Sequence, residues 1–192
     1  MRNKSNLTLV YSRPASLLPS KADKIIDGLH PAIEHLIARH QLLLAPVCTH
    51  SRYASLKPLC EATTDLDVIA AAALPNCNWV VQIGPSLIAV EFNLKLGRES
   101  VALLTADEPE GWSSTLQFGD DTSQFLFFRR PEGRIRFFGS RFAGLRVHSR
   151  ESGLLQIPPS WFVSGSPLKW ENPETAIKAA PGWLLEGQTD AA

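Results

Sequence analysis

The spacing of apolar residues predicts three helices. The first begins at Pro31, a residue that suits a first turn, and its apolar positions recur at helical spacing: Ala32, Ile33, Leu36 and Ile37. The second opens at residues 63–67, with Thr64 as its cap, and runs through residues 68–73. The third starts at Gly97. Three histidines spaced by five residues spread around the first helix, and we expect them to be solvated: His30, His35 and His40.

Short apolar runs predict the strands. In the first half of the chain these are residues 42–47, 79–83 and 87–93. The second half has further runs, rich in aromatic and branched residues: 114–118, 124–128, 135–138, 145–148 and 154–157. We therefore expect an α/β domain of the α+β type, with a mixed central sheet flanked by helices and a mostly antiparallel C-terminal half. Three tryptophans that follow the last run are expected to serve burial rather than base stacking: Trp161, Trp170 and Trp183.

The length of the chain favours a single domain. With 192 residues, 44% of them hydrophobic, it can bury one full core and has little room for a second. We expect a flexible N-terminal arm at residues 1–21, whose strand candidate is 7–11, then the domain at 22–185 and a tail at 186–192.

Charge and cysteine content narrow the functional classes. The 19 basic and 19 acidic side chains cancel, so any attraction to nucleic acid must come from a local patch. Cys48, Cys60 and Cys77 are odd in number and widely spaced, which argues against a disulfide framework and a structural zinc site. We expect reduced thiols and a cytoplasmic location, and no apolar run is long enough to predict a membrane span.

The run at residues 87–93 carries the first candidate chemistry. It ends in Glu91 and Asn93, which alternation places on one face of a strand. Two aspartates in this arrangement would hold a divalent cation, as phosphoryl transfer requires. Asn93 has no charge, so the spacing of the pair is kept but one of its two carboxylates is missing. Alternatively, both residues are ordinary exposed residues at a strand end.

Basic residues gather in one part of the chain, at Arg129, Arg130, Arg134, Arg136, Arg141, His148 and Arg150. Phenylalanines are interleaved with them, at Phe127, Phe128, Phe137 and Phe138. Local positive charge and aromatic faces can follow a nucleic-acid backbone and its bases. The alternative is ordinary strand alternation, with basic residues in solvent and aromatic residues in the core.

Several short pieces of the chain, taken in order, resemble one known family. They are Leu43–Val47, Lys57–Leu59, Glu61–Asp65, Leu74–Pro75 with Asn78, Val80–Asn93, Phe127–Arg129 with Pro131, Gly144–Val147, Gly153–Ser160, Gly165 with Trp170, and Pro181–Leu185. No single piece is specific, but this order and spacing are hard to produce by chance. The pattern covers roughly Ala32 to Leu185. It resembles the N-terminal primase-polymerase domain of bifunctional replication proteins from plasmids, phages and integrated elements, within the archaeo-eukaryotic primase superfamily.

This resemblance implies a catalytic site. The family has an aspartate-hydrophobic-aspartate pair on one strand, a histidine on a neighbouring strand and a third acid on another, and the acids hold two metal ions at the triphosphate. By position, the corresponding residues here are Glu91, Asn93, Phe125 and Arg146. The candidates for contact with a nucleotide or nucleic acid are then Lys57, Ser123, Arg129, Arg130, His148 and Arg150.

These substitutions change the charge of the implied site. Three acids carry a formal charge of about −3, which two divalent cations offset, whereas Glu91 and Arg146 together carry about zero. A guanidinium would repel metal ions and can pair with Glu91 instead. We therefore predict that Glu91 and Arg146 lie on adjacent strands within hydrogen-bonding reach. We expect no cofactor, with Mg²⁺ or Mn²⁺ bound only by an active enzyme.

Three hypotheses follow. The first is a degenerate, inactive primase-polymerase-like domain that binds DNA or a nucleotide, or regulates replication of a mobile element, beside a separate helicase or replication protein. The second is an active nucleotidyltransferase that uses Glu91 with other acids such as Asp120 or Asp121. The third is a protein-interaction domain.

Overall fold

The computed structural model describes residues 29–48, 56–106, 111–135, 142–149, 153–161 and 166–185. Within them the helices are α1 (Pro31–His40), α2 (Leu66–Ala72), α3 (Gly97–Leu104) and the short 3-10 helix η2 (Gly182–Leu184). The predicted arm at 1–21, its strand candidate at 7–11 and the tail at 186–192 lie outside the described residues. None of the helices in the described part of the chain has the length and apolar character needed to cross a membrane.

Nine strands form two sheets within the described ranges. They are β1 (Leu44–Val47), β2 (Asn78–Ile83), β3 (Leu87–Asn93), β4 (Gln117–Gly119), β5 (Ser123–Arg129), β6 (Leu145–His148), β7 (Gly153–Ile157), β8 (Lys169–Trp170) and β9 (Lys178–Ala179). The smaller sheet has the order β1-β2-β7, and the larger has the order β6-β3-β5-β4-β8 with β9 beside β5. All pairs are antiparallel except β5 with β9. The α+β class is confirmed, and the strands divide between two sheets where the sequence suggested one.

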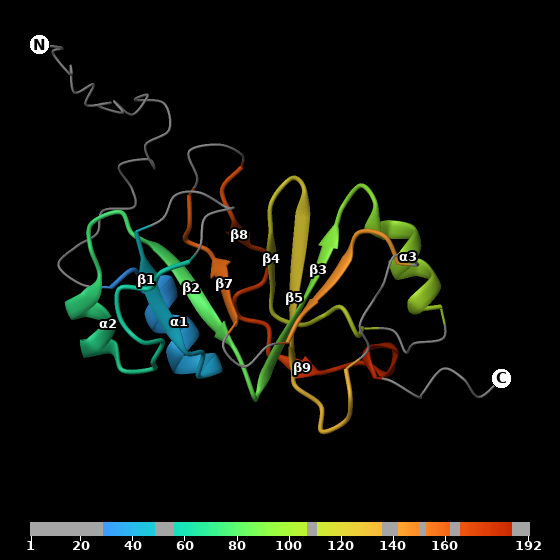
Figure 1. Cartoon of the computed structure of the whole chain (residues 1–192), viewed down its shortest axis with the longest axis horizontal. Helices are drawn as coiled ribbons and strands as arrows, with labels where there is room; N and C mark the ends of the chain where they lie inside the picture. The colour runs from blue at the N-terminus through green and yellow to red at the C-terminus, as the bar shows by residue number, and fades with distance from the viewer. Residues whose placement is uncertain are drawn as a thin grey trace, which may run out of the picture.

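The smaller sheet lies on the left of the view and the larger sheet beside it on the right (Figure 1). α1 and α2 accompany the smaller sheet, and α3 lies at the far end of the larger one. The turn at residues 84–86 leads directly from β2 to β3, so the chain passes from one sheet to the other there. Most of the candidate site residues fall on the larger sheet.

Local capping explains where α1 and α2 begin. Pro31 is the first residue of α1, and Nδ1 of His30 accepts a hydrogen bond from the backbone N–H of Ala32 at 3.2 Å. The cap of α2 is Asp65, not the predicted Thr64. Its Oδ1 accepts from the N–H groups of residues 67 and 68 at 3.0 and 3.2 Å. Asp65 directly precedes the first helical residue, so its carboxylate reaches the free amides of the first turn.

The larger sheet is covered on both faces. One face shares a core with α1 and the smaller sheet, formed by residues that include Ile33, Leu36, Leu44, Val81, Ile83, Ala89, Phe118 and Phe127. The other face packs with η2 in a second core of Ile88, Val90, Phe92, Leu126, Phe128, Ile135, Leu145, Trp183 and Leu184. Burial on both faces explains the continuous apolar run that begins β3. Trp183 is 1% exposed, which confirms its predicted burial role.

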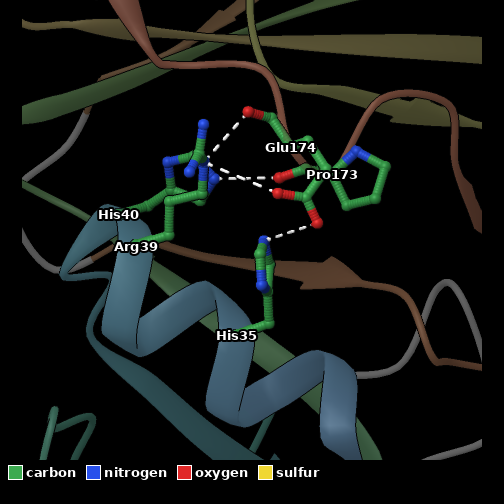
Figure 2. Close-up of polar contacts among 5 residues, drawn as sticks. All are labelled: His35, Arg39, His40, Pro173 and Glu174. Carbon is green, nitrogen blue, oxygen red and sulfur yellow. Dashed lines mark hydrogen bonds and ion pairs between the residues drawn. The ribbon is translucent and has the colours of Figure 1, made fainter.

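The expectation of solvated histidines is wrong: His30, which caps α1, is half-buried, and so are His35 and His40. His35 and His40 lie where the chain at residues 173–174 crosses α1 (Figure 2). Nε2 of His40 lies 3.0 Å from the Pro173 carbonyl oxygen, and Nε2 of His35 lies 3.3 Å from Oε1 of Glu174. Nε of Arg39 donates to the Glu174 carbonyl at 2.9 Å. Burial lowers the pKa of His40, although its hydrogen bond to the Pro173 carbonyl acts in the opposite direction.

Candidate functional site

The strand register places Glu91, Phe125 and Arg146 in one row. Glu91 lies on β3, directly opposite Phe125 on β5 and directly opposite Arg146 on β6. Directly opposite residues share a face of the sheet, with Cβ atoms about 4.5–5.5 Å apart. The adjacency predicted for Glu91 and Arg146 is therefore correct. The three positions come from separate parts of the chain, so their alignment is a result of the fold.

The neighbouring rows place the other candidates. One step along the same face, Asn93 lies opposite Ser123. One step in the other direction, Ala89 lies between Phe127 and His148. We call the group formed by Glu91, Phe125, Arg146 and His148 the Glu91 patch.

The Glu91 patch opens to solvent on the β6 side. β6 is the last strand of the larger sheet in the described part of the chain, and Arg146 on it is exposed. The side chains of Glu91 and His148 are 27% and 20% exposed. Phe125 is half-buried and stacks on Phe118, with ring centroids 4.7 Å apart. The patch is thus an accessible edge of charged groups against an aromatic wall.

The carboxylate of Glu91 bonds to His148. Nε2 of His148 lies 2.9 Å from Oε2 of Glu91. The two residues are diagonal neighbours across β3 and β6, a relation within reach of long side chains. The predicted placement of Glu91 and Arg146 on adjacent strands is therefore correct, and the contact described for the Glu91 carboxylate is with the His148 imidazole. The sequence placed His148 among basic residues but gave no indication of this pairing, because it depends on register.

Asn93 has a local structural role. Its Oδ1 accepts from the N–H groups of Lys95 and Leu96, both at 3.0 Å, in the turn before α3. The Asn93 N–H donates to the Gly144 carbonyl at 2.7 Å, which joins this turn to the chain just before β6. The amide side chain is therefore used by the backbone of the turn.

Gly144 allows this close approach. Its φ is +78°, and a Cβ there would lie 2.6 Å from the Gly97 nitrogen and 2.8 Å from the Leu96 carbonyl carbon. Only glycine fits this combination of backbone angle and contact. The start of β6 is consequently held against the start of α3.

The acids proposed for an active enzyme are engaged in other contacts. Oδ1 of Asp120 accepts from the N–H groups of Thr122 and Ser123, at 2.7 and 2.9 Å, and shapes the turn into β5. Asp121 accepts a hydrogen bond from the Ser166 hydroxyl. Ser123 itself is 8% exposed.

The remaining basic candidates do not join the patch. Arg129 is exposed on the same face but at the other end of β5, about 13 Å along the strand from Phe125. Nη1 of Arg130 donates to the Ser149 carbonyl at 2.8 Å and ties the ends of β5 and β6 together. Lys57 is exposed beside Pro58, which bridges to β1 in the smaller sheet. Arg150 lies outside the described residues.

The comparison with known families identifies the fold. A family model described as bifunctional DNA primase/polymerase, N-terminal, matches residues 26–183. The chain belongs to this family. The match includes both sheets and the whole Glu91 patch of this primase/polymerase-family domain. A search of the curated proteins finds no match.

The residues of this primase/polymerase-family domain do not fit the pair of metal ions that the family implies. Of the four implied positions, only Glu91 carries a carboxylate, and Arg146 places a cation directly across from it. Asn93 offers a neutral oxygen that already accepts two hydrogen bonds. Across the described ranges, no three His, Cys, Asp or Glu side chains gather as a metal site would need. The arrangement instead presents a guanidinium and an imidazole, groups that bind phosphate directly.

Proposed function

We propose that this primase/polymerase-family domain binds a phosphate-bearing nucleotide or nucleic acid at the Glu91 patch and does not catalyse nucleotidyl transfer. The observation that carries the proposal is the direct opposition of Arg146 and Glu91 on adjacent strands. In the family an acid is implied at the position of Arg146, and the exchange reverses the charge at the centre of the site.

The charge reversal decides which ligand the patch favours. Catalysis with two metals needs carboxylates that clamp both ions. Here the single carboxylate is bonded to His148, and one of the two side chains directly opposite it is cationic. A guanidinium can bind a phosphate with two parallel hydrogen bonds and needs no metal between them. The same exchange that weakens metal binding therefore strengthens direct contact with phosphate.

Arg129 places a second exposed cation at the other end of the same face. Arg146 and Arg129 lie on the same face and are both exposed, with Glu91 and His148 beside the first of them. Because buried Ala89 and Phe127 lie between the two rows, each arginine can contribute a separate phosphate contact, which is the sequence-independent part of nucleic-acid binding. In this proposal the domain serves replication or maintenance of a mobile element, alongside a separate helicase or replication protein.

The test combines binding with catalysis. Fluorescence anisotropy with a labelled single-stranded DNA, measured over a series of salt concentrations, gives the slope of log K against log salt. We expect Arg146→Ala to lower the magnitude of this slope by about 0.7, the contribution of one phosphate contact on a single strand. Lys169→Ala removes the same charge from an exposed position on β8 and should leave the slope unchanged.

Primer extension completes the test. We expect no extension with Mg²⁺ or Mn²⁺. Metal-dependent synthesis by the wild-type chain that disappears in Glu91→Ala would overturn the proposal and establish an active nucleotidyltransferase. An unchanged salt slope in Arg146→Ala would remove the patch from the binding surface.

A further inference from the structure

A cleft lies on the reverse face of the larger sheet from the Glu91 patch. It is bounded by α3, by β4 and β5, and by the turn that contains Trp112. On β5, Gln124 and Leu126 line it, and they alternate with Phe125, which faces the other way. Its volume is about 510 Å³, which falls within the range of small-molecule sites. We call it the α3 cleft.

The floor of the α3 cleft is apolar. Phe92, Val101, Leu126 and Trp112 all line it. The Trp112 indole is half-buried and packs edge-on against Trp183, with ring centroids 5.4 Å apart, and lies 6.4 Å from the Phe92 ring. A fixed indole at the wall of a cleft is a surface on which a planar heterocycle can stack.

Two glutamine amides face the cleft in a defined orientation. Nε2 of Gln124 donates to Oε1 of Gln117 at 3.1 Å and lies 3.2 Å from a carboxylate oxygen of Glu171. These contacts use the amide nitrogen of Gln124 and the oxygen of Gln117. They leave the Nε2 group of Gln117 as a donor and Oε1 of Gln124 as an acceptor. A neighbouring donor and acceptor match the edge of a nucleobase.

The α3 side of the cleft carries a cation that can hold an anionic group. Arg98 is the one charged residue among the described residues that line the cleft, and it is exposed. It lies in the first turn of α3, on the side of the cleft away from the two glutamines on β4 and β5. A ligand that touches both sides therefore needs a planar polar part and an anionic part.

We propose that the α3 cleft binds a nucleoside monophosphate unit, with the base against Trp112 and the two glutamines and the phosphate on Arg98. The unit can be a free nucleotide or one residue of a single strand, because the recognised chemistry is the same. The inference uses none of the residues of the Glu91 patch, so it stands apart from the proposed function. Sequence patterns gave no sign of this site, since Trp112, Gln117 and Gln124 belong to no motif.

Calorimetric titration of the full chain with the four ribonucleoside monophosphates, with adenosine and with inorganic phosphate tests the inference. We expect Arg98→Ala to weaken monophosphate binding about tenfold, a loss of about 1.4 kcal/mol. Adenosine binding should not change in this variant. Gln117→Leu should weaken adenosine and the monophosphates alike. The matched control is Lys95→Ala. Lys95 is exposed, lies three residues before Arg98 and does not line the cleft, so this variant removes the same charge nearby without touching the site.

Further measurements separate the possible outcomes. A tryptophan fluorescence change on nucleotide binding should disappear in Trp112→Phe, and circular dichroism checks that this variant is folded. A labelled oligonucleotide that competes with the monophosphate would identify the single strand as a source of the ligand. Three results would overturn the inference: no binding of any nucleotide at millimolar concentration, binding that is unchanged in both Arg98→Ala and Gln117→Leu, or binding lost in Arg146→Ala instead. The last result would place the nucleotide at the Glu91 patch and support the proposed function alone.

Discussion

Restoring the acids that the family implies should restore metal binding. In the double variant Asn93→Asp with Arg146→Asp, three carboxylates would stand at two adjacent rows of β3 and β6. The carboxylate introduced by Asn93→Asp can accept the same two hydrogen bonds, because the native amide uses only its oxygen for them. The formal charge of the chain becomes more negative by about three units at pH 7.

The magnitude follows from the register. Directly opposed carboxylates about 5 Å apart repel by about 0.8–3.3 kcal/mol for an effective dielectric constant of about 80 to 20. We therefore expect the metal-free double variant to lose about 1–3 kcal/mol of stability. A divalent cation at about 100 times its Kd returns about 2.7 kcal/mol. For a domain of this size, that corresponds to a rise in Tm of about 5–11 °C.

Thermal unfolding followed by circular dichroism, with and without Mn²⁺, measures this effect. The wild-type Tm should not respond to Mn²⁺. Asn76→Asp with Lys95→Asp changes the formal charge equally at two exposed loop positions, and its Tm should not respond either. A wild-type Tm that rises as much as that of the double variant would refute the reasoning, because the patch would then hold a cation as it stands. A double variant that ignores Mn²⁺ would show that the register does not bring the three carboxylates together.

The remaining predictions concern stability. Gly144→Ala should cost about 2–5 kcal/mol in urea denaturation from its positive φ and backbone clash, whereas Gly133→Ala, whose Cβ would meet only a side chain at 3.9 Å, should be near neutral. Asp65→Ala should cost about 1 kcal/mol through loss of the α2 cap, and an unchanged urea midpoint would contradict that role. Burial lowers the pKa of His40 below its ordinary 6.5, so the unfolded chain binds the proton first. The free energy of unfolding should therefore reach its full value above about pH 6.5 and decrease below it. If His40 causes this decrease, the decrease should be smaller in His40→Gln.

Sequence periodicity predicted the elements that are long enough to show a period. α1, β2 and β3 lie close to their predicted bounds because each carries a clear run of buried positions. β8 and β9 have two residues each, too few for any alternation, and were not predicted. The predicted run at 135–138 is described only at Ile135, which bridges to Leu185. The division into two sheets depends on which strands pair, and pairing is a long-range property that local patterns do not contain.

The candidate site could be predicted in part for the same reason. The family pattern selected Glu91, Phe125 and Arg146, and the register shows that these three positions meet. It also grouped Lys57 and Arg129 with them, and these side chains lie elsewhere, because closeness in a motif does not fix closeness in space. The bond between Glu91 and His148 and the whole α3 cleft became visible only with the fold.

The contact between Gly97 and Gly144 joins α3, on one side of the larger sheet, to the chain that enters β6. Besides this contact, the Ser100 hydroxyl donates to the Ala143 carbonyl at 3.1 Å, so α3 meets the chain that enters β6 at two points. α3 is a wall of the cleft on one side, and β6 carries Arg146 on the other. Because these contacts join the two elements, we expect any effect of a ligand in the α3 cleft on affinity at the Glu91 patch to be matched by an equal effect in the other direction.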